Sequence, residues 1–358
     1  MKYLRMLRKL FLYAGIEKQD YDQLLPSIRE ENLVLLKVFS ELAAAMFFLL
    51  YILSAFFGSF VTVNRMSYLA STIGMLILLL CVHLVLPKHP ALIMLVVYIF
   101  EIILFGFGIR ISMLHADKAA VSAVAFLLVS PLLFYDRPIR ISALIAAVVA
   151  TFSTLVVQYK DPSVAESDIW NMITFGFVAI TTTVFMMRVK ICSLAQSRQI
   201  IYLSQTDLLT GVKNRNHFEN RLKEYSQMFT SNLICVYADV NGLHEMNNRQ
   251  GHAAGDCMLR DVAEAMRKCF GSEHTYRIGG DEFVGFHIDG NPQEVSSAVD
   301  QLKGQLSKKG YHVSFGIALR EKAQGSLDTY ALVNEAEKNM FEDKREFYRQ
   351  SKNDRRSR

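Results

Sequence analysis

Long apolar runs before residue 188 are the feature that most constrains how this chain folds. A helix that crosses the hydrocarbon core of a bilayer, roughly 30 Å thick, needs about 20 mostly apolar residues. Six stretches approach that length, at 38–60, 68–87, 91–109, 118–135, 141–157 and 169–187. The sequence therefore predicts an α-helical transmembrane bundle of six helices over residues 32–187, followed by a separate soluble unit.

Basic residues are unequally distributed between the loops of this predicted bundle. Eleven Lys and Arg residues fall in the segment 1–31 and in every second loop, whereas four fall in the loops between them. Loops rich in Lys and Arg stay in the cytoplasm, so both termini are predicted to be cytoplasmic. Segment 1–31 mixes basic and apolar residues, which favours an amphipathic helix on the membrane surface. The basic residues behind the net charge of +5 are concentrated beside the predicted spans, so this charge does not indicate nucleic-acid binding.

The composition changes after Met187. Residues 188–205 are predicted to form a connecting helix, and apolar Leu194, Ile201 and Leu208 recur there at intervals of seven. This short heptad favours pairing of two copies of the chain. A helix that only continues the last span is the alternative.

The chain beyond residue 205 alternates apolar strands with amphipathic helices. Strands are predicted at 232–239, 275–278, 283–288 and 311–319, and helices at 255–270, 291–309 and 327–347. This alternation predicts one compact α/β (α+β) domain over 206–350. The polar residues 351–358 are predicted to form a disordered tail.

Acidic residues stand where two of these strands end. Asp239 closes an apolar strand, and Asp281 and Glu282 follow Gly279 and Gly280 in a turn, where glycines tolerate positive φ and close approach of a ligand. If the hairpin pairs beside strand 232–239, the carboxylates converge. Carboxylate and carbonyl oxygens suit Mg²⁺, which binds phosphate oxygens and supports phosphoryl transfer. A solvated acidic turn is the alternative.

Five segments, in order and over about 204–349, resemble the GGDEF family of diguanylate cyclases. They are TDLLTGVKNRNHFE (206–219), YADVNGLHEMNNRQGHAAGD (237–256), RIGGDEFVGF (277–286), VSFGIA (313–318) and AEKNMFEDK (336–344). The resemblance implies a nucleotidyl-cyclase-like fold and a homodimer that condenses two GTP into cyclic di-GMP and pyrophosphate. It also implies a multi-pass protein of the bacterial inner membrane, with the lipid bilayer as a partner and downstream cyclic di-GMP receptors.

The resemblance implies roles for individual residues. Asp239, Asp281 and the Val240 carbonyl would hold Mg²⁺, or Mn²⁺ in its place. Glu282 would be a further ligand or the acceptor of the 3′-hydroxyl proton. The implied substrate contacts are the backbone at Gly279 and Gly280, the guanine-reading pair Asn247 and Asp256, and Lys344, Arg277 and His244 near the phosphates.

Three positions depart from the family pattern. His244 replaces a lysine, Tyr348 replaces a second phosphate-binding arginine (with Arg349 adjacent), and Phe270 replaces the arginine of an inhibitory R-x-x-D motif. Product inhibition through that motif is therefore not expected. The first two departures leave an alternative open, a catalytically degenerate module that binds GTP as a receptor or allosteric domain.

Overall fold

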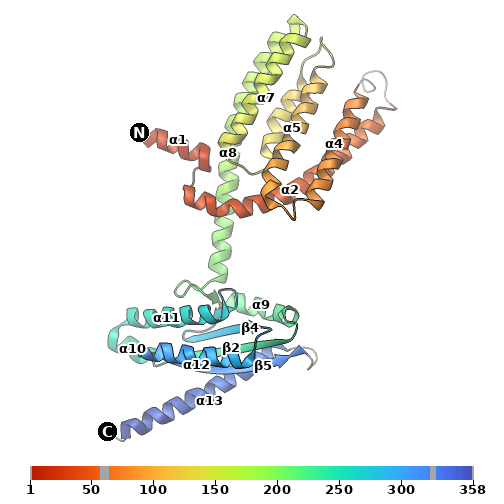
Figure 1. The fold of residues 1–358 in the computed structure, drawn as a ribbon. Coiled ribbons are helices and arrows are strands. Elements are labelled where there is room, and N and C mark those ends of the chain that lie inside the picture. Colours follow the sequence, from red (N-terminus) through yellow and green to blue (C-terminus); the bar gives the residue numbers. More distant parts are fainter. Residues whose placement is uncertain (1, 57–63, 323–327, 357–358) are drawn as a thin grey trace. The chain divides into compact units, whose positions relative to one another are not determined.

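The computed structural model describes residues 2–56, 64–322 and 328–356 (Figure 1). The chain divides into two compact units, Met1–Ser197 and Arg198–Arg358.

The described residues of the first unit form helices. These are α1 (Lys2–Tyr13), α2 (Lys18–Leu53), α4 (Arg65–Leu84), η1 (Pro90–Leu92), α5 (Ile93–Ser112), α6 (Val121–Val129), η2 (Ser130–Leu132), α7 (Pro138–Tyr159) and α8 (Pro162–Gln205). The predicted amphipathic segment 1–31 lies in α1 and the beginning of α2. Because α2 is continuous, the predicted boundary at residue 31 is not a helix boundary.

Five helical stretches of the described chain are long and apolar enough to cross a membrane. They are Lys2–Leu53, Arg65–Leu84, Pro90–Ser112, Pro138–Tyr159 and Pro162–Gln205. The predicted span 38–60 coincides with the end of α2 as far as Leu53, and its residues 57–60 lie outside the described part of the chain.

The predicted span 118–135 requires a correction, so six long helices are not confirmed. The α6 helix has 9 residues and reaches only about 14 Å at about 1.5 Å per residue. Pro131 has no backbone N–H and disfavours helical geometry in the residue before it, so the chain tightens into η2 at Ser130–Leu132.

The α6 helix nevertheless packs against α5, and the residues on either side of it are tied to other helices of the unit. Before α6, the Ala120 N–H donates to Asp168 Oδ1 on α8 (3.0 Å), just beyond the turn after α7. After η2, the Tyr135 N–H donates to Asn32 Oδ1 and the Tyr135 carbonyl accepts from Asn32 Nδ2, both at 2.8 Å. Tyr135 lies three residues before Pro138, the first residue of α7. Residues 120–135 are therefore anchored to α8 at their beginning and to α2 at their end.

Residues 188–205 do not form a separate element. They are the last part of α8, which includes the predicted span 169–187 and has no Pro or Gly after Gly176 to interrupt it. The alternative that the connector continues the last span is therefore the one that the structure shows.

The second unit contains a five-stranded sheet in the order β1-β3-β4-β2-β5. Its strands are β1 (Lys213–Asn214), β2 (Asn232–Asn241), β3 (Thr275–Arg277), β4 (Glu282–Ile288) and β5 (His312–Glu321). The predicted strands and the α/β fold class are confirmed for this unit; the short β1 was not predicted. The longest strand, β2, pairs antiparallel with β4 on one side and with β5 on the other.

Helices cover both faces of this sheet. They are α9 (Arg215–Met228), α10 (Leu243–Gln250), α11 (His252–Phe270), α12 (Pro292–Lys308) and α13 (Thr329–Arg356) (Figure 1). Alternate residues of β2 point to opposite faces: Ile234 and Val236 pack in a cluster with α11 and α12, and Leu233 and Cys235 pack in a cluster with α9 and α13. Burial on both faces explains why β2 is almost continuously apolar.

The predicted tail also requires a correction. Helix α13 continues to Arg356, so residues 351–356 are helical, and residues 357–358 lie outside the described part of the chain. No Gly or Pro interrupts residues 329–356, and Lys and Arg favour a helix that has already begun.

Candidate active site

The pairing of β2 with β4 brings three carboxylates to one end of the sheet. Asp239 lies directly opposite Glu282 in the antiparallel register. The next residue, Val240, donates its backbone N–H to the carbonyl of Asp281 at 3.0 Å. The hairpin thus lies beside strand 232–239, in the arrangement that makes Asp239 and Asp281 neighbours.

At Gly279 the available space, rather than the backbone conformation, favours glycine, whereas no atom lies within 4 Å of a Cβ added at Gly280. Neither Gly279 nor Gly280 is among the residues with positive φ, so the turn does not use the tolerance of glycine for that conformation. A Cβ added at Gly279 would clash with the Glu282 carboxylate, whose Cδ would lie 3.1 Å away. The Ile278 N–H also donates to the Glu282 carbonyl at 3.0 Å, which holds the turn against this side chain.

Burial and neighbouring carboxylates raise the pKa values of Asp239 and Glu282. Burial raises the pKa of Asp239 above its ordinary value of 3.8, a hydrogen bond from Lys344 opposes this, and the charge of Asp281 adds to it. Burial, followed by the charges of Asp281 and Asp239, raises the pKa of Glu282 above 4.5. Such a group of acids is stabilised in its ionised form by a nearby cation.

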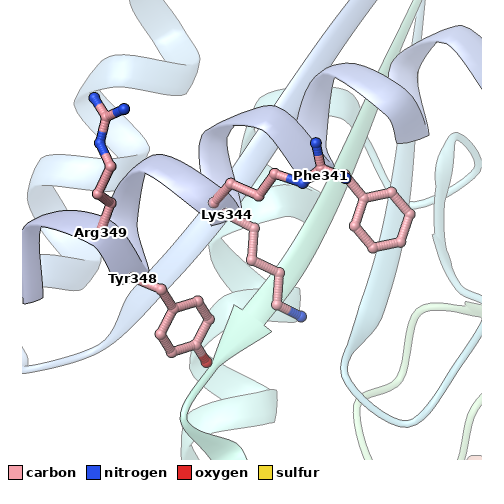
Figure 2. Close-up of a pocket in the computed structure, with 5 residues that line it drawn as sticks. Phe341, Lys344, Tyr348 and Arg349 are labelled. Atoms are coloured by element: carbon pink, nitrogen blue, oxygen red, sulfur yellow. The ribbon is translucent and has the colours of Figure 1, made fainter. Parts of the chain in front are cut away.

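Lys344 supplies one positive charge to this group. It extends from α13, and its Nζ donates to Asp239 Oδ1 at 2.6 Å, forming an ion pair with a carboxylate that is only 6% exposed. Figure 2 shows its side chain reaching toward β2. Lys344 and Asp239 are 105 residues apart in the sequence, and the packing of α13 on β5 and β2 brings them together.

The donor chemistry of this group fits a divalent cation. Carboxylate oxygens of Asp239, Asp281 and Glu282 are hard ligands of the kind that Mg²⁺ and Mn²⁺ accept. The side chains are not arranged as a finished metal site: no group of three or more His, Cys, Asp or Glu within residues 2–56, 64–322 and 328–356 is placed to hold an ion. The ammonium of Lys344 lies at the Asp239 oxygen instead.

Asn247 and Asp256 come from consecutive helices, α10 and α11. Asn247 Oδ1 is buried and has no hydrogen-bond partner in the structure. It lies against Gly255, where an added Cβ would be 3.0 Å from Asn247 Cγ. A buried acceptor without a donor is costly, so this oxygen is suited to receive an N–H from a ligand.

Arg277, which is predicted to lie near the phosphates, contacts the acidic turn itself. Its guanidinium donates to Asp207 Oδ1 at 3.0 Å and to the Gly280 carbonyl at 2.6 Å, so it braces the acidic turn. Burial raises the pKa of Asp207, but hydrogen bonds from Thr210 and Arg277 lower it below its ordinary value overall. The role of Asp207 was missed, although it stands in the quoted segment TDLLTGVKNRNHFE.

The three departures from the family pattern have clear positions. His244 is exposed on α10, with its Nε2 3.1 Å from Asn248 Nδ2. Tyr348 lies one turn after Lys344 and lines, with Phe341, Lys344, Arg345 and Arg349, a pocket of about 410 Å³ (Figure 2). Figure 2 shows Arg349 pointing away from Lys344 and Tyr348, and its guanidinium pairs with Glu346 at 2.8 Å.

Phe270 is a core residue. It is 6% exposed and packs against β4, where a Cβ on Gly285 would lie 2.5 Å from its ring. A buried aromatic ring at this position cannot present a cation to a ligand.

Comparison with known proteins agrees with this geometry. Residues 204–350 match the family model described as "Diguanylate cyclase, GGDEF domain". The cyclic di-GMP phosphodiesterase PdeB of Shewanella oneidensis is 31% identical over 152 residues, which is 42% of this chain and 18% of that protein. The diguanylate cyclase DgcS of the same organism is 23% identical over 156 residues, 42% of this chain and 52% of that one. The chain thus spans about half, or less, of the length of these curated relatives.

Two further likenesses extend beyond the domain. An uncharacterized membrane protein of Staphylococcus saprophyticus is 22% identical over 214 residues, 57% of this chain and 60% of that protein. The crystal structure of the coiled coil and GGDEF domain of DgcB from Caulobacter crescentus, in complex with c-di-GMP, covers 48% of this chain and 94% of its own, with 20% identity and a TM-score of 0.40. The C-terminal part of this chain is therefore a GGDEF domain, with diguanylate cyclases among its relatives.

Proposed function

We propose that this protein is a membrane-anchored diguanylate cyclase that condenses two GTP molecules into cyclic di-GMP and pyrophosphate. The observation that carries the proposal is the convergence of Asp239, Asp281 and Glu282 at one end of the sheet, beside Lys344. Its match to the GGDEF model and its similarity to curated diguanylate cyclases support the same reaction.

In the proposed mechanism, the acidic residues hold Mg²⁺ or Mn²⁺ and the lysine binds phosphate. Asp239, Asp281 and the Val240 carbonyl are the proposed ligands, and the cation supplies charge neutralisation on the GTP phosphates when bound. Lys344 exchanges its contact with Asp239 for a phosphate oxygen. Glu282, whose pKa is raised, accepts the proton of the attacking 3′-hydroxyl, because a more basic carboxylate is the better proton acceptor.

We further propose that Asn247 and Asp256 select guanine. Guanine presents N1–H and N2–H₂ as adjacent donors, and the buried Asn247 oxygen and the Asp256 carboxylate are acceptors. Adenine offers no such pair of donors.

The proposed catalytic form is a homodimer, because the reaction joins two GTP molecules that are held on two facing domains. Apolar side chains near the end of α8 support an association of two copies. Ile200, Ile201 and Leu203 are 66%, 53% and 44% exposed, which is costly for a helix end in water.

For the membrane unit, we propose six crossings of the bacterial inner membrane, with both ends of the chain in the cytoplasm and with regulation of the cyclase by this unit. Five of the crossings are the long apolar helices. The sixth is the segment around α6, supported by the packing of α6 on α5 and by the hydrogen bonds of Ala120 to α8 and of Tyr135 to α2. The excess of Lys and Arg in alternate loops gives the orientation.

A second candidate function is a GTP receptor without turnover. The observation in its favour is Tyr348, a neutral side chain one helical turn from Lys344, where a second cation would assist phosphate binding.

The experiment incubates the purified full-length protein with GTP and Mg²⁺ and identifies the product by mass spectrometry. We expect cyclic di-GMP from the wild type and none from Asp281→Ala, whereas Asp300→Ala, which removes an exposed acid on α12, retains activity. GTP binding without product at any protein concentration would establish the receptor instead. Asp256→Asn should lower the preference for GTP over ATP, and specific activity should rise with protein concentration as the dimer forms.

A further inference from the structure

A polar cavity of about 160 Å³ lies within the membrane unit, separate from the GGDEF domain. A single buried water requires roughly 10–15 Å³ by the same measure, so this cavity has room for a much larger group. Its polar lining consists of Tyr21, Arg29, Asp136, Arg137 and Arg140, and apolar side chains, including Met94, complete the wall.

Positive charge dominates this cavity. Three arginines line it against one carboxylate, Asp136, which already accepts a hydrogen bond from Tyr98 and lies 3.5 Å from Arg140 Nη1. The first turn of α7 and the first turn of α5 also contribute Arg140 and Met94 to the wall, and helix N-termini carry partial positive charge. Even with Asp22 beside Arg137, the three arginines outnumber the two carboxylates, and this excess of positive charge favours an anion in the cavity.

The three arginines differ in how tightly they are packed, so a structural role can be distinguished from a role in binding. The Arg137 guanidinium lies over the rings of Tyr13 and Tyr21, at 5.5 and 5.3 Å, and 3.5 Å from Asp22. It therefore has a bracing role in addition to its charge. The Arg140 side chain is 52% exposed and Arg29 is exposed, so both can move onto a ligand at little cost to packing.

The cavity lies where the chain is expected to leave the membrane on its cytoplasmic side. Arg137 and Arg140 belong to one of the loops rich in basic residues, and Asn32 fixes that loop to α2 by its pair of hydrogen bonds with Tyr135. Anionic head groups are found at this depth, and basic pockets between helices on this side are suited to them.

We propose that this cavity is a binding site for a phosphate group, supplied by the head group of an anionic phospholipid. Guanidinium groups match phosphate oxygens with paired donors, so the three arginines of this chain suit a phosphate group. Leu25, Ile28 and Met94 give the same cavity an apolar wall that suits the glycerol and the upper acyl chains. Inorganic phosphate could make the same contacts with the guanidinium groups, but it has no apolar part to pack against the apolar wall.

The test measures phosphatidylglycerol binding to the full-length protein in neutral detergent by native mass spectrometry, with phosphatidylcholine as the comparison lipid. Saturable binding of phosphatidylglycerol is expected. Arg140→Gln and Arg29→Gln should each weaken it about fivefold, the effect of one charge near an anionic head group. Arg140→Lys keeps the charge and should retain most of the affinity.

Arg65→Gln is the matched control, because Arg65 is the first residue of α4 and lies over the ring of Tyr51, away from the cavity. Unchanged lipid binding in both cavity variants, or an equal loss in the control, overturns the proposal. Titration with inorganic phosphate distinguishes the two sources. Phosphate binding that is lost in the cavity variants, with lipid binding unaffected, would overturn the lipid assignment and show a soluble phosphate ligand.

Discussion

Gly316 in β5 determines how closely α13 approaches the sheet, and Gly316→Ala should therefore be strongly destabilising. A Cβ at this position would lie 2.8 Å from the Asn339 carbonyl carbon and closer still to the Ala336 oxygen and the Met340 nitrogen. These are backbone atoms of α13 and cannot rotate away. The Asn339 carbonyl carbon alone would have to retreat by about 0.6 Å to reach an ordinary contact of 3.4 Å, and the two closer atoms would have to retreat further.

The cost of that retreat is estimated from overpacking in well-packed cores. Such substitutions cost about 1–3 kcal/mol, and a rigid backbone obstacle favours the upper half of this range. With a urea m-value of about 2 kcal/mol/M, the unfolding midpoint of residues 198–358 should fall by about 1 M. Because α13 carries Lys344 to Asp239, cyclase activity should fall as well.

A second glycine provides the matched control. Gly304 lies on an exposed face of α12, and no atom lies within 4 Å of the Cβ that alanine would add. Alanine is favoured over glycine inside a helix by up to about 1 kcal/mol, so Gly304→Ala should raise the midpoint by up to about 0.5 M. The reasoning is refuted if Gly316→Ala unfolds at the same urea concentration as the wild type or at a higher one.

Three further predictions concern the site. The raised pKa of Glu282 makes the folded state bind more protons than the unfolded state, so the stabilising effect of the protonated side chain is lost as the pH rises above the ordinary value of 4.5. Glu282→Gln should therefore reduce the loss of thermal stability with rising pH, measured by thermal melts without metal. An unchanged pH dependence in this variant would contradict the prediction. Lys344→Met removes a charge-assisted contact to Asp239 and to phosphate, and should lower kcat/KM for GTP about 10- to 100-fold in steady-state assays. Gly255→Ala would displace Asn247 and should raise the KM for GTP about tenfold; an unchanged KM would exclude Asn247 from guanine binding.

The strands and the meeting of the acids could be predicted because each follows from a local pattern. The apolar run from Leu233 to Ala238 predicts a buried strand, and a glycine turn between two apolar stretches predicts a hairpin. The local pattern does not determine which strand the hairpin pairs with, and the register of Asp239 with Glu282 shows that its partner is β2. The α10 helix was missed, since its sequence LHEMNNRQ buries none of its residues and so has little apolar periodicity.

Features that depend on distant residues could not be predicted from the local pattern. Arg277 pairs with Asp207, 70 residues earlier, and nothing near either residue identifies its partner. Hydropathy alone predicts one helix over 118–135, which is too long. Pro131 within this span indicates the interruption that the structure has at η2. The reason for a glycine in the turn could not be predicted either, because a crowded position and a position with positive φ both favour glycine.

The position of β2 at the centre of its sheet has a consequence for biosynthesis. Both neighbours of β2, at 282–288 and 312–321, are translated after it, and the helix that carries Lys344 is translated later still. A nascent chain that ends before β4 exposes an apolar strand with two unpaired edges, which favours aggregation or capture by a chaperone. The apolar helices precede all of these segments in translation, so in the proposed membrane-anchored form they leave the ribosome before the acidic site is complete.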